Sequence, residues 1–281
     1  MNVLILGSGG LLGKYLSGIF EKSNRVFKPS HSELNILNYE EFHSFIKKNK
    51  IEVCINCAGL TNIYYCEKHP DEALKVNSYS PAEMAKISKE SGCKFIHLST
   101  GFVFNGEKKT EYVESDLPEP KTVYGFTKYK GEILILENNP DSLIIRTDEI
   151  FGYSNFTPGH NVIGFTIKKI LEGKDVSLYN ITTSPTYALD LSLKIEEILR
   201  KKPNFSGILH LVNKGFVSYI DVAKFIKDFL KKDVKINVRN DELIEKIPKN
   251  CALKSEKLEN LGIEIMPTFE DALKRSIKEF L

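Results

Sequence analysis

The chain has 281 residues, enough for one large domain or two small ones with a substantial core. Its 39 Lys and Arg residues nearly balance 37 Asp and Glu, which argues against a protein recruited to nucleic acid by bulk charge. Tryptophan is absent, although the chain contains 17 Phe and 12 Tyr.

The sequence also argues against a membrane or secreted protein. No apolar run approaches the roughly 18 residues of a membrane span. The N-terminal residues MNVLILGSGG lack the basic leader and cleavage site of a signal peptide. The five cysteines are too few and too scattered for a disulfide framework. We therefore expect a cytoplasmic protein that contacts neither membrane nor nucleic acid.

Short apolar runs alternate with amphipathic stretches through the first half of the chain. Such alternation predicts βαβ units and an α/β fold of the Rossmann type, with a doubly wound parallel sheet. The expected strands are Val3–Leu6, Arg25–Phe27, Val53–Asn56, Phe95–Leu98 and Leu143–Ile145. The expected helices are Leu11–Glu21, Tyr39–Lys48, Ser80–Glu90 and Tyr124–Glu137.

The pattern changes after Arg146. Residues 151–161 have the composition of a loop, and amphipathic stretches separated by short strands follow. We expect a dinucleotide-binding domain over 1–150 and a smaller α/β substrate-binding domain over 151–281, with segments returning to the first. The expected helices of this half are Val162–Glu172, Leu189–Lys201, Tyr219–Leu230 and Phe269–Phe280.

A glycine-rich turn joins the first strand to the first helix. It reads Gly7-Ser8-Gly9-Gly10-Leu11-Leu12-Gly13, a GxxGxxG in the strand–turn–helix context that dinucleotide binding requires. Gly7 permits the tight turn, Gly10 lets the backbone approach a pyrophosphate, and Gly13 lets helix and strand pack closely. The N–H groups at the helix start then receive the anion.

The end of the second strand bears on the choice of cofactor. A carboxylate there would bind the ribose 2′-OH of NAD. Lys28-Pro29-Ser30-His31 stands there instead, and Lys28 and Ser30 can neutralise and bind a 2′-phosphate. NADPH is therefore favoured over NADH, although a merely solvated Lys28 leaves both open.

Tyr124 and Lys128 form a YxxxK at the start of a helix, where positions i and i+4 share one face. A nearby ammonium favours the phenolate, so we expect Lys128 to lower the pKa of Tyr124 from about 10 towards the working pH. The tyrosine can then exchange a proton with a carbonyl or alcohol. Ser99-Thr100 follow a buried strand at an edge where doubly wound sheets bind ligands, so Thr100 can hold the same oxygen.

These motifs resemble the extended short-chain dehydrogenase/reductase family. The resemblance rests on GxxGxxG, Asn56-Cys57-Ala58-Gly59, Asn77, Ser99-Thr100 and YGFTK. Over nearly the whole chain, the order and spacing are most similar to the dTDP-4-dehydrorhamnose reductases. Further matches are LSTGFVFNG (98–106), Arg146-Thr147, Ser184-Pro185-Thr186-Tyr187 and Pro248-Lys249-Asn250.

The resemblance implies reduction of the 4-keto group of a 4-keto-6-deoxy nucleotide sugar by a monomer or homodimer. Tyr124 would be the proton donor, Lys128 would bind the nicotinamide ribose, and Thr100 would hydrogen-bond the keto group. The other expected cofactor-binding residues are Gly7, Gly10, Leu11, Leu12, Gly13, Lys28, Ser30, Asn35, Ile36, Cys57, Ala58, Gly59, Asn77 and Ser99. The expected substrate-binding residues are Thr61, Thr100, Gly101, Phe102, Glu149 and Asn250.

The sequence departs from this family around the substrate. Gly101-Phe102 stand where Asp-Tyr are usual, and Glu149 stands where these reductases carry a sugar-pocket tryptophan. A 4-epimerase, which also uses such a Tyr-Lys pair, and a non-catalytic cofactor-binding regulatory subunit therefore stay open. The six histidines show no metal-ligand spacing, so we expect no catalytic metal, and His97 is expected to be a core residue.

Overall fold

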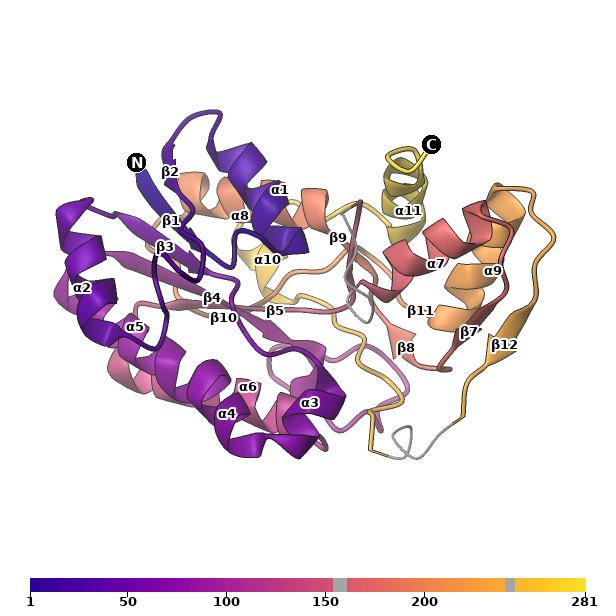
Figure 1. Cartoon of the computed structure of the whole chain (residues 1–281), viewed down its shortest axis with the longest axis horizontal. Helices are drawn as coiled ribbons and strands as arrows, with labels where there is room; N and C mark the ends of the chain where they lie inside the picture. The colour runs from indigo at the N-terminus through magenta and orange to yellow at the C-terminus, as the bar shows by residue number, and fades with distance from the viewer. Residues whose placement is uncertain (154–160, 241–245) are drawn as a thin grey trace.

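A computed structural model describes residues 1–153, 161–240 and 246–281 of the chain (Figure 1). Two lobes lie side by side, a larger one built on a six-stranded sheet and a smaller one built mainly from the second half of the chain. Within the described ranges, no helix is long and apolar enough to cross a membrane.

The sheet is wholly parallel and has the order β10-β5-β4-β3-β1-β2. Its strands are β1 (Asn2–Leu6), β2 (Arg25–Phe27), β3 (Val53–Asn56), β4 (Lys94–Thr100), β5 (Leu143–Thr147) and β10 (Gly207–His210). The direction of winding reverses between β1 and β3, the point where doubly wound sheets bind ligands beyond their carboxyl ends. The predicted fold class is confirmed.

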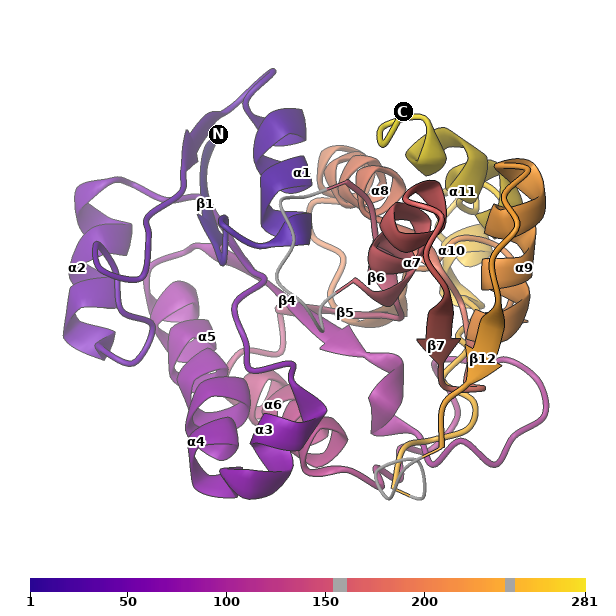
Figure 2. The ribbon, with the colours of Figure 1, turned by 45° about the vertical axis from the view of Figure 1, so that its right-hand side comes forward.

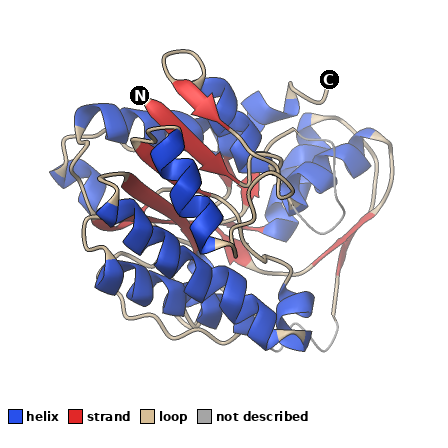
Figure 3. Ribbon diagram, turned by 60° about the vertical axis from the view of Figure 1, so that its left-hand side comes forward, coloured by secondary structure: helices blue, strands red, loops and turns tan. Residues whose placement is uncertain are grey.

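Helices cover both faces of this sheet, as Figures 2 and 3 show. One face packs against α1 (Leu11–Phe20), α8 (Ala188–Lys201) and α10 (Lys257–Asn260). The other packs against α2 (Tyr39–Lys48), α5 (Ser80–Glu90) and α6 (Val123–Asn138). Successive strand residues point to opposite faces, so Ile96 and Leu98 join the first core and Phe95 joins the second.

The smaller lobe has its own core, formed around α7 (Val162–Leu171), α9 (Tyr219–Phe229) and α11 (Phe269–Ile277). Three short strand pairs frame it. They are β6 (Ile150–Phe151) with β9 (Thr186–Tyr187), β7 (Val176–Leu178) with β12 (Ile236–Val238), and β8 (Thr182–Thr183) with β11 (Val217–Ser218).

The predicted elements are present, most with ends shifted by a few residues, and β2, β3, α2 and α5 match exactly. The segment between β3 and α5 was not predicted to be helical. It forms α3 (Ile63–Lys68), α4 (Pro70–Leu74) and a π-helical turn at Lys75–Tyr79. β10 and α8 come from the second half of the chain but complete the first sheet and cover it. The domain division at residue 150 stays a prediction.

Candidate active site

The glycine-rich turn has the geometry of an anion-binding helix start. Gly7 has φ +75°, and a Cβ there would lie 2.8 Å from the backbone N of Ala58. A Cβ at Gly13 would overlap the Gly7 carbonyl, so helix and strand touch through these residues. In the described part of the chain, no side chain caps the start of α1 at Gly10. The N–H groups of Leu11, Leu12 and Gly13 are therefore oriented towards an incoming anion.

The loop after β3 lies against this turn and is fixed by two asparagines. Asn56 Oδ1 accepts the Ala58 N–H at 3.0 Å. Asn77 is buried, and its side chain bonds both backbone groups of Leu60 at 2.9 Å and reaches Thr127 Oγ1 at 3.1 Å. The backbone of Cys57, Ala58 and Gly59 is thereby held beside Gly7. These expected cofactor contacts lie together at the switch point of the sheet.

Thr100 and Tyr124 meet at the carboxyl end of β4. Thr100 is the last residue of that strand, and its hydroxyl accepts the Phe102 N–H at 3.2 Å. Tyr124 is the second residue of α6, whose start is capped by the Thr122 side chain. The rings of Phe102 and Tyr124 cross edge to face at 5.6 Å between centroids. Thr100, Phe102 and Tyr124, which were all expected in the site, therefore lie together at the end of β4.

The pKa of Tyr124 does not move from about 10 towards the working pH, as the sequence led us to expect. Burial is the largest influence and raises the pKa of Tyr124 to about 12, although a hydrogen bond with Thr100 lowers it in part. The phenol is thus protonated at neutral pH. A protonated phenol is the form that a proton donor needs.

Lys128 points under the end of β4. Its ammonium nitrogen lies 2.9 Å from His97 Nε2 and 2.5 Å from the Leu98 carbonyl oxygen, and the residue is 5% exposed. Burial lowers the pKa of Lys128 to about 8, while the charge of Glu132 opposes that shift. Lys128 therefore loses its proton at mildly alkaline pH.

His97 is buried as expected, but it contacts the candidate active site. It is 1% exposed, and its second ring nitrogen faces Asn56 Nδ2 at 3.1 Å. Burial, followed by the charge of Lys128, holds the pKa of His97 well below its usual value, so the ring is neutral. The sequence-based interpretation of His97 as a core residue missed this contact.

Ser99 does not lie with the cofactor candidates. Its hydroxyl donates to Glu132, which forms a buried ion pair with Arg146 at 2.7 Å. Both charged residues are 1% exposed. Ser99 faces the opposite side of the sheet from Thr100 because neighbouring strand residues alternate. The hydroxyl of Ser99 is thus engaged by Glu132, and its contact with the cofactor stays a prediction.

The residues expected at the adenosine end already have acidic partners. The Lys28 ammonium pairs with Glu21 at 2.6 Å, and the Ser30 hydroxyl donates to Glu33 at 2.8 Å. Both contacts are exposed and must open to admit a 2′-phosphate. Asn35 Oδ1 accepts the Leu37 N–H. The Ile36 carbonyl accepts from Ser80, which fixes this segment at the sheet edge.

Two expected substrate residues have structural roles. Asn250 is buried, and its side chain bonds the carbonyls of Lys108 and Thr110 and the N–H of Ala252. A Cβ at Gly101 would overlap the Cys251 carbonyl, which explains why no larger residue stands there. The smaller lobe thus packs directly on the loop after Thr100.

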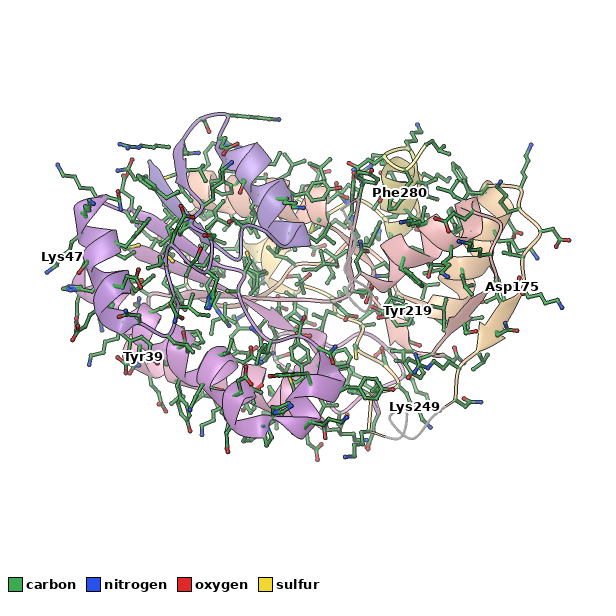
Figure 4. All side chains as sticks on the ribbon, in the orientation of Figure 1. Tyr39, Lys47, Asp175, Tyr219, Lys249 and Phe280 are labelled. Carbon is green, nitrogen blue, oxygen red and sulfur yellow. The ribbon has the colours of Figure 1, made fainter. Side chains whose placement is uncertain are left out.

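Glu149 lies half-buried between the lobes and joins two helices of the smaller one. It accepts from the Tyr219 hydroxyl at 2.6 Å and from the Ile163 N–H at 3.4 Å. Figure 4 labels Tyr219, which begins α9 and lies nearer the middle of the molecule than Asp175. Burial raises the pKa of Glu149. Thr61 is exposed before α3, and its contact with the sugar stays a prediction.

Asp148 is an acidic residue that the sequence reasoning missed. It accepts from Thr183 Oγ1 at 2.6 Å and from Ser184 N at 3.0 Å. Burial raises its pKa to about 7, and its charge acts on Tyr124. Its position directly after Arg146-Thr147, at the end of a buried strand, was the signal that could have identified it.

These residues fit a dinucleotide cofactor. The tight glycine turn and the uncapped helix start suit a pyrophosphate, while Thr100 ends β4 and Tyr124 and Lys128 lie in the first two turns of α6. Among the residues described, no three His, Cys, Asp or Glu side chains gather as metal ligands.

Comparison with known proteins identifies the family. The family described as RmlD substrate binding domain matches residues 1–281, the full chain. The chain belongs to this family. The sequence resemblance to the extended short-chain dehydrogenase/reductases is thereby confirmed.

The chain is similar to reductases and also to a subunit of methionine adenosyltransferase 2. It is 31% identical to dTDP-4-dehydrorhamnose reductase of Aggregatibacter actinomycetemcomitans over 80% of this chain and 78% of that one. It is 28% identical to methionine adenosyltransferase 2 subunit beta of Mus musculus over 99% and 88%. A crystal structure of Bacillus anthracis dTDP-4-dehydrorhamnose reductase in complex with NADP superimposes with a TM-score of 0.91 at 27% identity, covering 99% of each chain.

Proposed function

We propose that the chain is an NADPH-dependent oxidoreductase that reduces the 4-keto group of a 4-keto-6-deoxy nucleotide sugar. The observation that carries the proposal is the protonated Tyr124 phenol, hydrogen-bonded to Thr100 at the carboxyl end of β4. The similarity to dTDP-4-dehydrorhamnose reductases, one of them in complex with NADP, supports the substrate class and the cofactor.

The chain's own residues orient the keto group and move one proton. Thr100 donates a hydrogen bond to the keto oxygen, and Tyr124 gives that oxygen its hydroxyl proton as the alcohol forms. Reduced nicotinamide supplies the hydride when it is bound. The phenolate left on Tyr124 is stabilised by the Lys128 ammonium one helical turn away, and Tyr124 then regains its proton from solvent.

The other expectations complete this proposal. A cytoplasmic enzyme would have both the nucleotide sugar and NADPH available. A monomer or homodimer is consistent with a site built from residues of one chain.

The similarity to methionine adenosyltransferase 2 subunit beta supports a second candidate, a regulatory subunit that binds a dinucleotide. The changed residues Gly101 and Glu149 favour it, because they replace the usual sugar-facing side chains. A 4-epimerase would use the same Tyr-Lys pair with no net consumption of cofactor.

Oxidation of NADPH at 340 nm with a panel of 4-keto-6-deoxy nucleotide sugars tests the proposal. Tyr124→Phe should lower the rate by roughly 10²–10⁴-fold, the usual contribution of a positioned general acid. Tyr129→Phe is the matched control on the same helix, because Tyr129 packs against the cluster around Phe104 instead. The reductase proposal fails if folded, NADPH-binding protein turns over none of these sugars.

A further inference from the structure

Asn56, His97 and Lys128 form a buried line of side chains beneath the candidate active site. Asn56 and His97 are neighbours across β3 and β4, and Lys128 comes from α6, which covers that face. Asn56 Nδ2 lies 3.1 Å from His97 Nδ1, and His97 Nε2 lies 2.9 Å from Lys128 Nζ. Asn56 and His97 are each 1% exposed, so solvent does not compete for these contacts.

The direction of this hydrogen-bond chain follows from the backbone. The Ala58 N–H can only donate, and it lies 3.0 Å from the Asn56 side-chain atom assigned as Oδ1. That contact orients the amide and leaves the Asn56 NH₂ group facing the imidazole. Since an NH₂ group donates, His97 Nδ1 must accept. A neutral imidazole carries one proton, which therefore lies on Nε2 and faces Lys128.

A donor facing Lys128 favours one protonation state of that lysine. An ammonium has three donors and no lone pair, whereas an uncharged amine can accept the Nε2–H of His97. We propose that Asn56 and His97 are positioning residues that hold Lys128 through a one-way hydrogen-bond chain, which favours its uncharged amine and so sets the alkaline limit of the reaction. The consequence for the reaction rests on the proposed function, whereas the tautomer of His97 does not.

The other groups around Lys128 oppose the chain or are uncharged. Glu132, one turn along α6, favours the ammonium. The Cys57 thiol follows β3, and burial raises its pKa to about 12, so it stays neutral. Tyr124, on the same helix, is protonated. Burial lowers the pKa of Lys128 to about 8, in the direction that the chain also favours. Above that pH, Lys128 no longer offers a positive charge to the phenolate of Tyr124.

The tautomer of His97 tests the chain directly. Long-range ¹H–¹⁵N NMR of the six histidines in the cofactor-free protein distinguishes a protonated from an unprotonated ring nitrogen, and His97→Gln assigns the signals. We expect His97 to carry its proton on Nε2. Asn56→Asp should reverse the chain, because a carboxylate accepts from both the Ala58 N–H and His97 Nδ1–H. A wild-type His97 protonated on Nδ1 overturns the proposal.

The pH profile tests the effect on Lys128. In Asn56→Asp, Nε2 becomes an acceptor for the Lys128 ammonium, so the alkaline limb of kcat should move up by at least about one pH unit.

Asn139→Asp is the matched control. Asn139 is also buried, and its Oδ1 also accepts the N–H two residues on, but its NH₂ donates to the Ala85 carbonyl at the other end of α6. In Asn139→Asp, the alkaline limb of kcat should lie at the same pH as in the wild type. An unmoved limb in Asn56→Asp overturns the role of the chain, and absence of turnover in every protein overturns the proposed function while the NMR result still stands.

Discussion

Removing the charge of Glu132 tests how much the buried ion pair with Arg146 contributes to the stability of the fold. The carboxylate receives three hydrogen bonds from Arg146, at 3.0 and 3.2 Å from Nε and at 2.7 Å from Nη2. Among the described residues, Arg146 Nη1 has no partner. Glu132→Gln therefore leaves a guanidinium charge in the core with no compensating charge in contact.

The expected loss is about 3–5 kcal/mol in the free energy of unfolding, since both side chains are 1% exposed and breaking a buried pair costs this much. The loss is a large share of the roughly 5–15 kcal/mol that stabilises a typical protein. Replacing both partners, Glu132→Leu with Arg146→Met, should recover most of it because no lone charge remains buried. Methionine can keep the packing of Arg146 on the Phe104 ring, now 5.2 Å from the guanidinium carbon.

Urea unfolding followed by far-UV circular dichroism measures this, as the chain has no tryptophan to report by fluorescence. Glu196→Gln is the control, because its ion pair with Arg200 lies at the surface at 3.4 Å and should contribute less than about 1 kcal/mol. A loss below about 1 kcal/mol in Glu132→Gln, or a double variant no more stable than the single one, would refute the reasoning.

Three further changes test other parts of the structure. Because burial raises the pKa of Asp148 to about 7, the folded protein holds that proton more tightly than the unfolded chain, and stability is lost as pH rises from about 4 to 7. The free energy of unfolding of Asp148→Asn, compared with that of the wild type by urea unfolding, should therefore rise by about 2–3 kcal/mol from pH 5 to pH 8. A difference between the two proteins that does not change with pH would contradict this. Gly101→Ala should cost about 1–3 kcal/mol because its Cβ meets the Cys251 carbonyl, whereas Gly9→Ala, with open space, should be tolerated in thermal unfolding. Lys28→Ala should weaken NADPH binding about tenfold by titration and leave NADH binding unchanged; equal losses would show that Lys28 does not contact the 2′-phosphate.

Local pattern was enough to predict most strands and helices of the larger lobe. Strands such as Val53–Asn56 are apolar throughout because both faces of a parallel sheet are buried. Helices such as Tyr39–Lys48 begin at a capping asparagine and carry lysines in their last turn, signals that depend only on neighbouring residues. The GxxGxxG turn and the YxxxK pair are likewise local, so the chemistry they predict could be read from spacing.

Contacts between distant segments could not be predicted in this way. β10 lies in the second half of the chain and yet pairs with β5 at the edge of the first sheet. Such a pairing depends on which sheet edge is open in the folded molecule, and local sequence does not show that. Asn250 was predicted from family position alone, and only the packing of the loop around Lys108 shows that its amide is fully used.

The candidate active site likewise combines features that local sequence predicts with contacts that only the packing of distant segments decides. The sequence by itself determined that Tyr124 and Lys128 share a helix face and that a hydroxyl ends β4. Only the tertiary structure decided that Lys128 turns to His97, because that contact depends on how α6 lies across β3 and β4. Burial at the same interface raises the pKa of Tyr124 and lowers that of Lys128, and burial belongs to the packed molecule and not to any one segment.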